Sequence, residues 1–315
     1  MANAMAGPAR PAEGFTHLAL LYSGTREYLA GVLAHLQASL KRAEPSFVAV
    51  PAPKADLLRA ELNGESAGVL FADMSELGRN PARIIPRVRA FIDDHPGQRV
   101  SYVGEPIWPT RSAAELREAT RHEALINLAF SGTAATILCP YDTAALAPSV
   151  VADARRTHPA LLQRGQCRVS PEYCGPASLP PECERPLPPP PPGSESITYL
   201  SDLSAARGMV TSYASRAGAT EDAIADLVLA VGEIAANTLR HTGGRGTLHI
   251  WHTAEEILCQ VDDQGQIADP LAGRLRPAPD APGGHGLWLV NQICDLVELR
   301  SGPAGTSIRM HMRRS

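Results

Sequence analysis

Residues 231–244 of the chain are VGEIAANTLRHTGG, a stretch with the apolar rhythm of a packed helix. The pattern begins at residue 221, and its apolar positions fall on one side of a wheel of 3.6 residues per turn. That stripe is expected to pack on a sheet. Glu233 and Asn237 lie on the opposite side, one turn apart, and His241 follows one turn later. Taken alone, such polar residues are ordinarily the solvated back of a helix.

Two further motifs follow this helix in the chain. VDDQG, residues 261–265, ends a predicted strand, and there Asp263 can accept a hydrogen bond from the amine of a flat polar ring while Gly265 permits close approach of the backbone. GGHGLWLV, residues 283–290, places glycines at the start of a helix, where free amides suit phosphates. Each motif alone is weak, since the first is also an ordinary Asp-Gly turn.

The three motifs in this order resemble the N, G1 and G2 boxes of the GHKL ATPase superfamily. Within it, the chain is most similar to the anti-sigma-factor serine kinases, over a domain of residues 195–315. The resemblance implies an α+β ATP-binding sandwich of the Bergerat type, and the consecutive strands predicted after residue 246 agree with an antiparallel or mixed sheet. Helices are expected at 201–217, 221–241 and 286–294, and strands at 247–252, 257–263, 296–301 and 306–312.

The resemblance also implies a role for each matching residue. Glu233 would be the catalytic base, and Asn237 would hold Mg²⁺ against the phosphates of ATP. The implied nucleotide-binding residues are Asn237, Asp263, Gly265, Gly284, Gly286, Leu287 and Thr306. Two positions depart from the family pattern: Trp288 replaces a third glycine, and His285 stands where arginine is frequent.

The implied function is a cytoplasmic regulator that sequesters a sigma factor and phosphorylates a serine of an anti-anti-sigma protein of the STAS type. The alternative is a catalytically inactive switch in which bound ATP only supports partner binding. A histidine kinase is disfavoured, because the residues between the proline-rich segment and position 220 are too few for a dimerising hairpin with a phosphoacceptor, and His241 is expected to be structural. This kinase family commonly dimerises, so a homodimer stays open.

The proline-rich segment 176–194 predicts a semi-rigid linker between two domains, with a ligand for another protein's aromatic groove as the alternative. Before it, strands and helices alternate, which predicts an α/β domain with a mostly parallel sheet over residues 15–175. Strands are expected at 17–22, 47–51, 68–73, 99–105 and 135–142, and helices at 25–43, 54–62 and 81–95.

In motif order, this first domain resembles the MEDS sensory domain of methanogen and methylotroph regulators. The resemblance implies a degenerate RecA-like fold and an unknown small-molecule ligand. The residues proposed to line its pocket or to bind a metal are Glu105, Trp108, His122, Glu123, Cys139, Asp142 and His158, although their separations form no compact metal motif and buried ion pairs would also explain them. Glu105 and Trp108 follow a strand, where α/β sheets commonly bind ligands.

Composition restricts the partners. A net charge of −4 and an aromatic content of 5% argue against direct nucleic-acid binding. No apolar run reaches the ~20 residues that a membrane span requires. Residues 1–14 are expected to form a flexible tail without an export signal. The cysteines form no CxxC pair. The sequence leaves open whether Cys167, Cys174 and Cys183 beside the linker bind a metal, act in redox chemistry or are free thiols.

Overall fold

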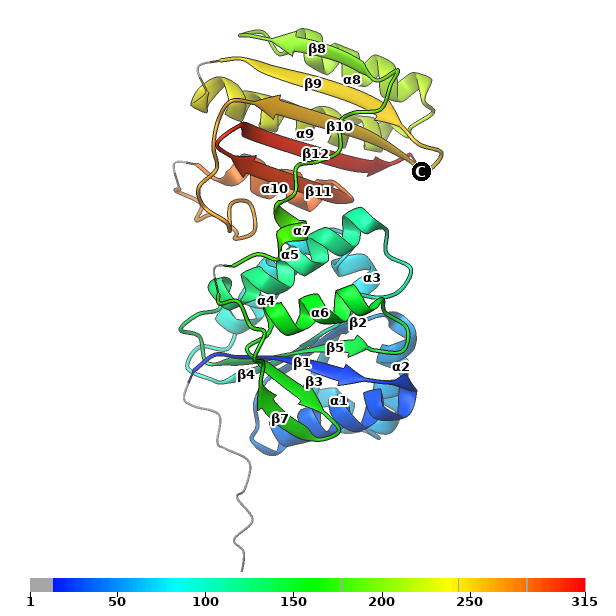
Figure 1. The fold of residues 1–315 in the computed structure, drawn as a ribbon, viewed down its shortest axis with the longest axis vertical. Coiled ribbons are helices and arrows are strands. Elements are labelled where there is room, and N and C mark those ends of the chain that lie inside the picture. The colour runs from blue at the N-terminus through cyan, green and yellow to red at the C-terminus, as the bar shows by residue number, and fades with distance from the viewer. Residues whose placement is uncertain (1–13, 177, 243, 282, 315) are drawn as a thin grey trace, which may run out of the picture. The chain divides into compact units, whose positions relative to one another are not determined.

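The structure is a computed structural model that describes residues 14–176, 178–242, 244–281 and 283–314. The chain divides into two compact units (Figure 1). The first comprises the residues up to Gly78 together with Arg87–Pro180, and the second comprises Arg79–Pro86 and the residues from Pro181 onward. The predicted tail lies outside the described residues up to position 13.

The first unit contains a seven-stranded sheet with the strand order β3-β2-β4-β5-β1-β6-β7. Its strands are β1 (Thr16–Tyr22), β2 (Ser46–Val50), β3 (Val69–Asp73), β4 (Val100–Gly104), β5 (Ala135–Asp142), β6 (Ala160–Gln163) and β7 (Gln166–Val169). All neighbouring strands run parallel except β6 and β7, which form an antiparallel hairpin. The prediction of an α/β unit with a mostly parallel sheet is therefore confirmed.

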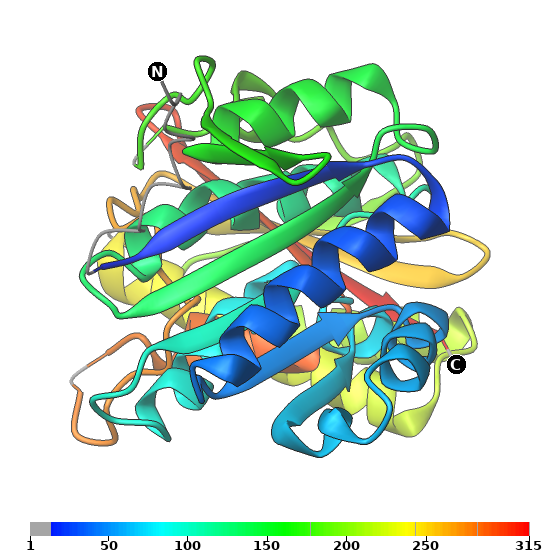
Figure 2. The ribbon, with the colours of Figure 1, turned by 90° about the horizontal axis from the view of Figure 1, so that it is seen from below.

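Helices connect these strands. They are α1 (Gly24–Lys41), α2 (Ala52–Glu61), α3 (Met74–Leu77), α4 (Ile84–Asp93), α5 (Ala113–Ala129) and α6 (Pro148–Thr157), with short 3₁₀ turns at Glu65–Gly68 and Pro81–Arg83. Figure 2 shows α1 lying across one face of the sheet. Its buried stripe, Tyr28, Val32 and Leu36, packs into the apolar core on that face.

Sequence reasoning missed α5, α6 and the β6–β7 hairpin. Helix α5 begins with a capping box, in which the Glu115 amide donates to Ser112 Oγ (3.3 Å) and the Ser112 amide to Glu115 Oε2 (2.7 Å). The helix is then buried on most of its sides, polar residues such as Thr120 and Asn127 included. Because no clean apolar stripe results, the helical period is hard to detect in the sequence.

The second unit contains a five-stranded sheet in which every neighbouring pair is antiparallel, with the order β11-β12-β10-β9-β8. Its strands are β8 (Glu195–Tyr199), β9 (Gly246–His252), β10 (Glu256–Asp263), β11 (Leu296–Gly302) and β12 (Gly305–Arg313). Its helices are the short α7 (Pro181–Glu184), then α8 (Ser204–Arg216), α9 (Glu221–His241) and α10 (His285–Ile293). Strand β8 is the one element of this sheet that was not predicted.

The three long helices cover one face of this sheet (Figure 1). Helix α9 begins at the predicted residue because Thr220 Oγ1 accepts from the Ala223 amide (3.3 Å) and caps it. Leu227, Val231 and Ile234 of α9 then join the core against the strands. This packing leaves the other side of α9 for polar residues, as the wheel predicts. No helix within the described ranges is both long and apolar enough to cross a membrane.

The opposite face of the sheet carries a buried polar network. The His311 ring nitrogens lie 3.1 Å from Glu256 Oε1 and 3.2 Å from Glu298 Oε1. Burial alone would lower the pKa of His311, but hydrogen bonds to these two carboxylates raise it to about 9. In the proline-rich segment, the Arg185 carbonyl accepts a hydrogen bond from Arg300 Nε (3.0 Å), so this segment also contacts the strands.

Candidate functional site

A cavity of about 450 Å³ lies in the second unit between α9, the end of β10, the loop that follows it and the start of α10. All of the residues predicted to bind the nucleotide line it, namely Asn237, Asp263, Gly265, Gly284, Gly286, Leu287 and Thr306. These positions come from separate segments of the chain, and the fold brings them around one space. His241 also lines the cavity.

Asp263 is held rigidly at one wall. Its Oδ2 accepts from Thr238 Oγ1 (2.7 Å), and its Oδ1 accepts from the Gly265 amide (2.8 Å). Thr306 Oγ1 donates to the Gly265 carbonyl (2.8 Å), which fixes the backbone beside it. A Cβ on Gly265 would lie 2.5 Å from Thr242 Cγ2, so only glycine fits. The result is a carboxylate in a set orientation beside a backbone that permits close approach.

Sequence reasoning missed the two threonines of this wall. Thr238 lies on α9 directly after Asn237, and Thr242 follows one helical turn later as the C-cap residue of that helix. Their spacing of four was the available signal, because side chains at i and i+4 share a helix face.

The start of α10 forms the other end of the cavity. Gly284 precedes the helix with φ of 88°, a left-handed conformation that favours glycine. The first amides of the helix have no partner inside it and carry the positive end of its dipole. A Cβ on Gly286 would lie 2.7 Å from Glu233 Oε2 and 3.3 Å from Asn237 Nδ2. Glu233 and Asn237 of α9 therefore lie directly beside these amides.

Both departures from the family pattern lie at this helix. His285 is exposed, and Trp288 is half-buried with Arg276 Cζ 5.8 Å from its ring centroid. Neither residue is among those that line the cavity. The oxygen of the Asn237 amide, Oδ1, accepts a hydrogen bond from Arg240 Nη1 (3.0 Å).

Two of the candidates in the first unit lie at the carboxyl edge of its parallel sheet. Glu105 follows β4 and Asp142 ends β5, beside Tyr22 at the end of β1. Tyr22 Oη donates to Glu105 Oε1 (3.0 Å), and Lys54 Nζ donates to both Tyr22 Oη (2.6 Å) and Glu105. Burial raises the pKa of Glu105 to about 7, although Lys54 opposes the shift. Tyr22, Tyr28, Lys54 and Asp142 line a small cavity of about 90 Å³.

Sequence reasoning missed Lys54 and Tyr22. Tyr22 ends β1 and Lys54 lies in the first turn of α2, at the same sheet edge as Glu105. The strand order was needed to bring them together, and the sequence alone does not give it.

Three other candidates, Glu123, Cys139 and His158, meet in the interior together with His17 of β1. Burial, and then the neighbouring His158, lower the pKa of His17 to about 4, so its ring is neutral at neutral pH. Sequence reasoning missed His17, although a histidine in the otherwise apolar strand HLALLY was a signal.

The remaining candidates join neither group. Trp108 has Arg111 Cζ 3.9 Å from its ring centroid, and His122 is buried on α5. Cys167 and Cys174 are exposed and Cys183 is buried, all as free thiols. Within the described ranges, these three cysteines form no group of clustered ligands.

Comparison with known proteins finds a family match within each unit. Residues 16–159 match the family model of the MEDS domain, the methanogen/methylotroph, DcmR sensory domain, and residues 199–312 match that of the histidine kinase-like ATPase domain. The serine-protein kinase RsbW of Halalkalibacterium halodurans is 34% identical over a region that covers 29% of this chain. That region spans 64% of the length of the relative. The first unit thus matches a sensory domain family, and the second matches an ATPase domain family and is similar to part of a serine-protein kinase.

Proposed function

We propose that the second unit binds ATP and Mg²⁺ in the cavity of about 450 Å³ and acts as an anti-sigma serine kinase. The observation that carries this proposal is the meeting of Asn237, the 263–265 wall and the 284–286 turn around one space. A kinase-type relative supports the same activity. We also propose a Bergerat-type sandwich for this unit and a degenerate RecA-like fold for the first.

The residues present fit the nucleotide. Asp263, fixed by two hydrogen bonds, accepts from the exocyclic amine of adenine, and Gly265 admits the ring. The free amides at the start of α10 receive the phosphates, and Gly286 keeps that approach open. Asn237 Oδ1 would hold Mg²⁺, and the exposed Arg240 would then have to turn away from that oxygen. When bound, Mg²⁺ neutralises charge on the phosphates.

Glu233 acts as the general base of the proposed kinase. Its carboxylate lies beside Gly286, next to the amides that hold the phosphates. It takes the proton of a substrate serine hydroxyl while the serine oxygen bonds to the γ-phosphorus. The bond from that phosphorus to the bridging oxygen breaks, and ADP leaves with the electron pair.

The proposed partners are a sigma factor and an anti-anti-sigma protein of the STAS type. The first unit is proposed to bind a small-molecule signal at the carboxyl edge of its parallel sheet, beside Glu105. The hydrogen bond between Arg240 and Asn237 favours one rival, an ATP-bound switch without catalysis, because it occupies the oxygen that Mg²⁺ needs.

Calorimetry with Mg·ATP tests the binding site. Asn237→Ala and Asp263→Asn are expected to weaken ATP binding strongly, whereas Asp280→Asn in the exposed loop before α10 keeps wild-type affinity. Unchanged affinity in Asn237→Ala would remove the site assignment.

Labelled ATP with STAS-type substrates tests the chemistry. Glu233→Gln should lose phosphoryl transfer but keep ATP binding, and Glu221→Gln at the exposed start of the same helix is the matched control. Partner binding without any labelling by the wild type would favour the inactive switch.

A further inference from the structure

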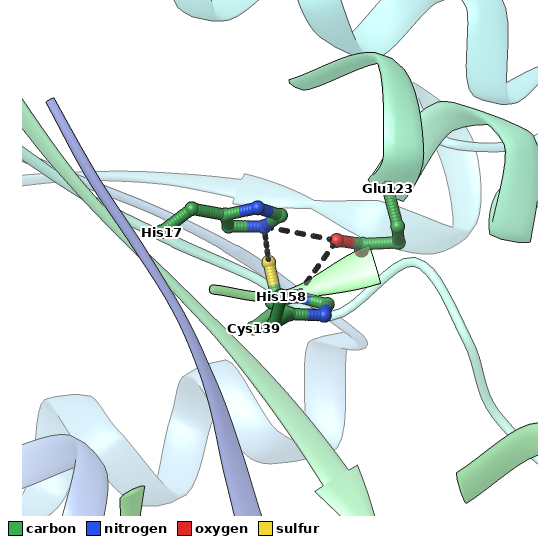
Figure 3. Close-up of side chains that lie close together, drawn as sticks. All are labelled: His17, Glu123, Cys139 and His158. Carbon is green, nitrogen blue, oxygen red and sulfur yellow. Dashed lines mark hydrogen bonds and ion pairs between the residues drawn. The ribbon is translucent and has the colours of Figure 1, made fainter. Parts of the chain in front are cut away.

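Four side chains from four segments of the first unit meet between the sheet and the helices that cover it (Figure 3). They are His17 of β1, Cys139 of β5, Glu123 of α5 and His158 directly after α6. Their ligating atoms all lie within 4.8 Å of one another, and each residue is at most 1% exposed. The cluster plays no part in the ATP site proposed for the second unit.

The parallel register of the sheet brings two of the four together. His17 pairs with Ile137, so Cys139 lies two residues further along the neighbouring strand on the same face. His17 Nε2 is 3.5 Å from Cys139 Sγ and 3.3 Å from Glu123 Oε2.

A neighbouring amide sets the tautomer of His17. Asn127 Nδ2 donates to the carbonyl oxygens of Thr157 (2.7 Å) and Ala124 (3.2 Å), which leaves its Oδ1 as an acceptor. His17 Nδ1 lies 3.1 Å from that oxygen and must donate to it. Nε2 is therefore the ring nitrogen that faces the cluster and that can act as a ligand there.

His158 is oriented in the same way. Its Nδ1 lies 2.7 Å from the Ala154 carbonyl, which can only accept, so Nδ1 carries a proton and Nε2 is the atom that offers a lone pair in the neutral ring. That Nε2 is 3.2 Å from Glu123 Oε2, yet it is buried without a hydrogen bond, as is Glu123 Oε1. Two histidine lone pairs and a carboxylate thus face one another across a buried space.

A cation among these four side chains would satisfy all of them. A buried carboxylate is costly unless an opposite charge compensates it. The ion pairs of Glu123 in the described ranges are with His17 and His158, and a metal ion bound at both Nε2 atoms would compensate the carboxylate in the same place as protons on these rings. Imidazoles held through their other nitrogen by an amide oxygen or a backbone carbonyl are typical metal ligands.

Three of the distances between ligand atoms are close to those around a tetrahedral ion. With bonds of about 2.0–2.3 Å, the ligand atoms of tetrahedral zinc lie about 3.3–3.7 Å apart. Three pairs in the cluster are at 3.2, 3.3 and 3.5 Å. Two imidazole nitrogens, a thiolate and a carboxylate suit zinc or a similar transition metal, whereas Mg²⁺ and Ca²⁺ prefer oxygen alone. We propose that His17, Glu123, Cys139 and His158 bind one transition-metal ion of the zinc class.

Zinc binding to the full chain tests the proposal. The exposed thiols are first removed as Cys167→Ser and Cys174→Ser, so that they do not bind metal themselves. After chelation and readdition of Zn²⁺ alone, this background should hold one zinc per chain. A competing chromophoric chelator then gives the affinity.

Cys139→Ser and Glu123→Gln are each expected to weaken zinc binding by at least the roughly 10–100-fold that loss of an outer-shell partner costs. Cys259→Ser is the matched control, because Cys259 is equally buried but lies in the second unit. With Co²⁺ in place of zinc, the thiolate-to-cobalt absorption should disappear in Cys139→Ser and persist in Cys259→Ser.

Failure of the folded background to take up zinc would overturn the proposal, and so would wild-type zinc affinity in both ligand variants. Circular dichroism checks the fold of each variant. If Cys139→Ser does not fold, the nearly isosteric Glu123→Gln decides. ATP binding by the second unit is measured on the same samples, so failure of the zinc site and failure of the proposed kinase are separate results.

Discussion

Substitution by alanine is expected to have a different effect at each of three glycines around the start of α10, namely Gly283, Gly284 and Gly286. Around Gly283 an added Cβ would meet nothing within 4 Å, so Gly283→Ala is the neutral control. Gly284 has φ of 88°, and a left-handed alanine there costs about 1–2 kcal/mol. Gly286 lies within the helix, where alanine is better by up to about 1 kcal/mol in propensity.

For Gly286→Ala the loss is expected in binding and not in folding. The new Cβ would lie 2.7 Å from Glu233 Oε2, so that flexible carboxylate must move. The methyl group and the displaced carboxylate then occupy the space where phosphates approach the helix amides. We expect ATP affinity to fall at least about tenfold, or 1.4 kcal/mol, while the free energy of unfolding stays the same or rises.

Calorimetry with Mg·ATP and urea unfolding measure the two quantities on all three variants. Gly283→Ala should match the wild type in both, and Gly284→Ala should lose stability. If Gly286→Ala binds ATP within twofold of Gly283→Ala, then the phosphates do not lie against this turn and the placement of the nucleotide is wrong.

Three further predictions concern buried polar groups. Lys54→Met should destabilise the chain by about 1.4 kcal/mol more at pH 8 than at pH 5. Because the wild-type pKa of Glu105 is about 7, this carboxylate is charged beside Lys54 at pH 8 but must take up a proton in the variant, whereas at pH 5 it is protonated in both proteins. Urea unfolding at both pH values checks this against the exposed Lys41→Met. The pKa of His311 is raised to about 9, so the stability that its charged ring contributes should be fully present below pH 6.5 and be lost as pH rises through 9. His311→Gln should therefore lower the free energy of unfolding by about 3 kcal/mol at pH 6 and by little at pH 10 in the same assay. Thr306→Val leaves a backbone carbonyl and a serine hydroxyl without their partner and should lower the free energy of unfolding by about 1–3 kcal/mol, measured by urea titration.

The second unit was predictable because its elements are amphipathic on a single face. Helix α9 spans Glu221–His241, the range that its apolar period predicts, since its core stripe and its cavity side are chemically distinct. The residues of the three motifs then line one cavity, although their roles stay predictions. Strand β8 was missed because it is mostly exposed and follows the proline-rich segment directly.

The first unit hid its chemistry because burial there does not separate polar from apolar residues. Glu123 lies on α5, which is buried around most of its circumference, so the sequence shows no apolar stripe against which a buried carboxylate would stand out. His17 and Cys139 are 122 positions apart, and only the parallel register of β1 on β5 makes them neighbours. Metal motifs are recognised in sequence when a turn or a helix fixes the ligand spacing. Where a sheet fixes it instead, strand order and register must be known before the ligands can be grouped.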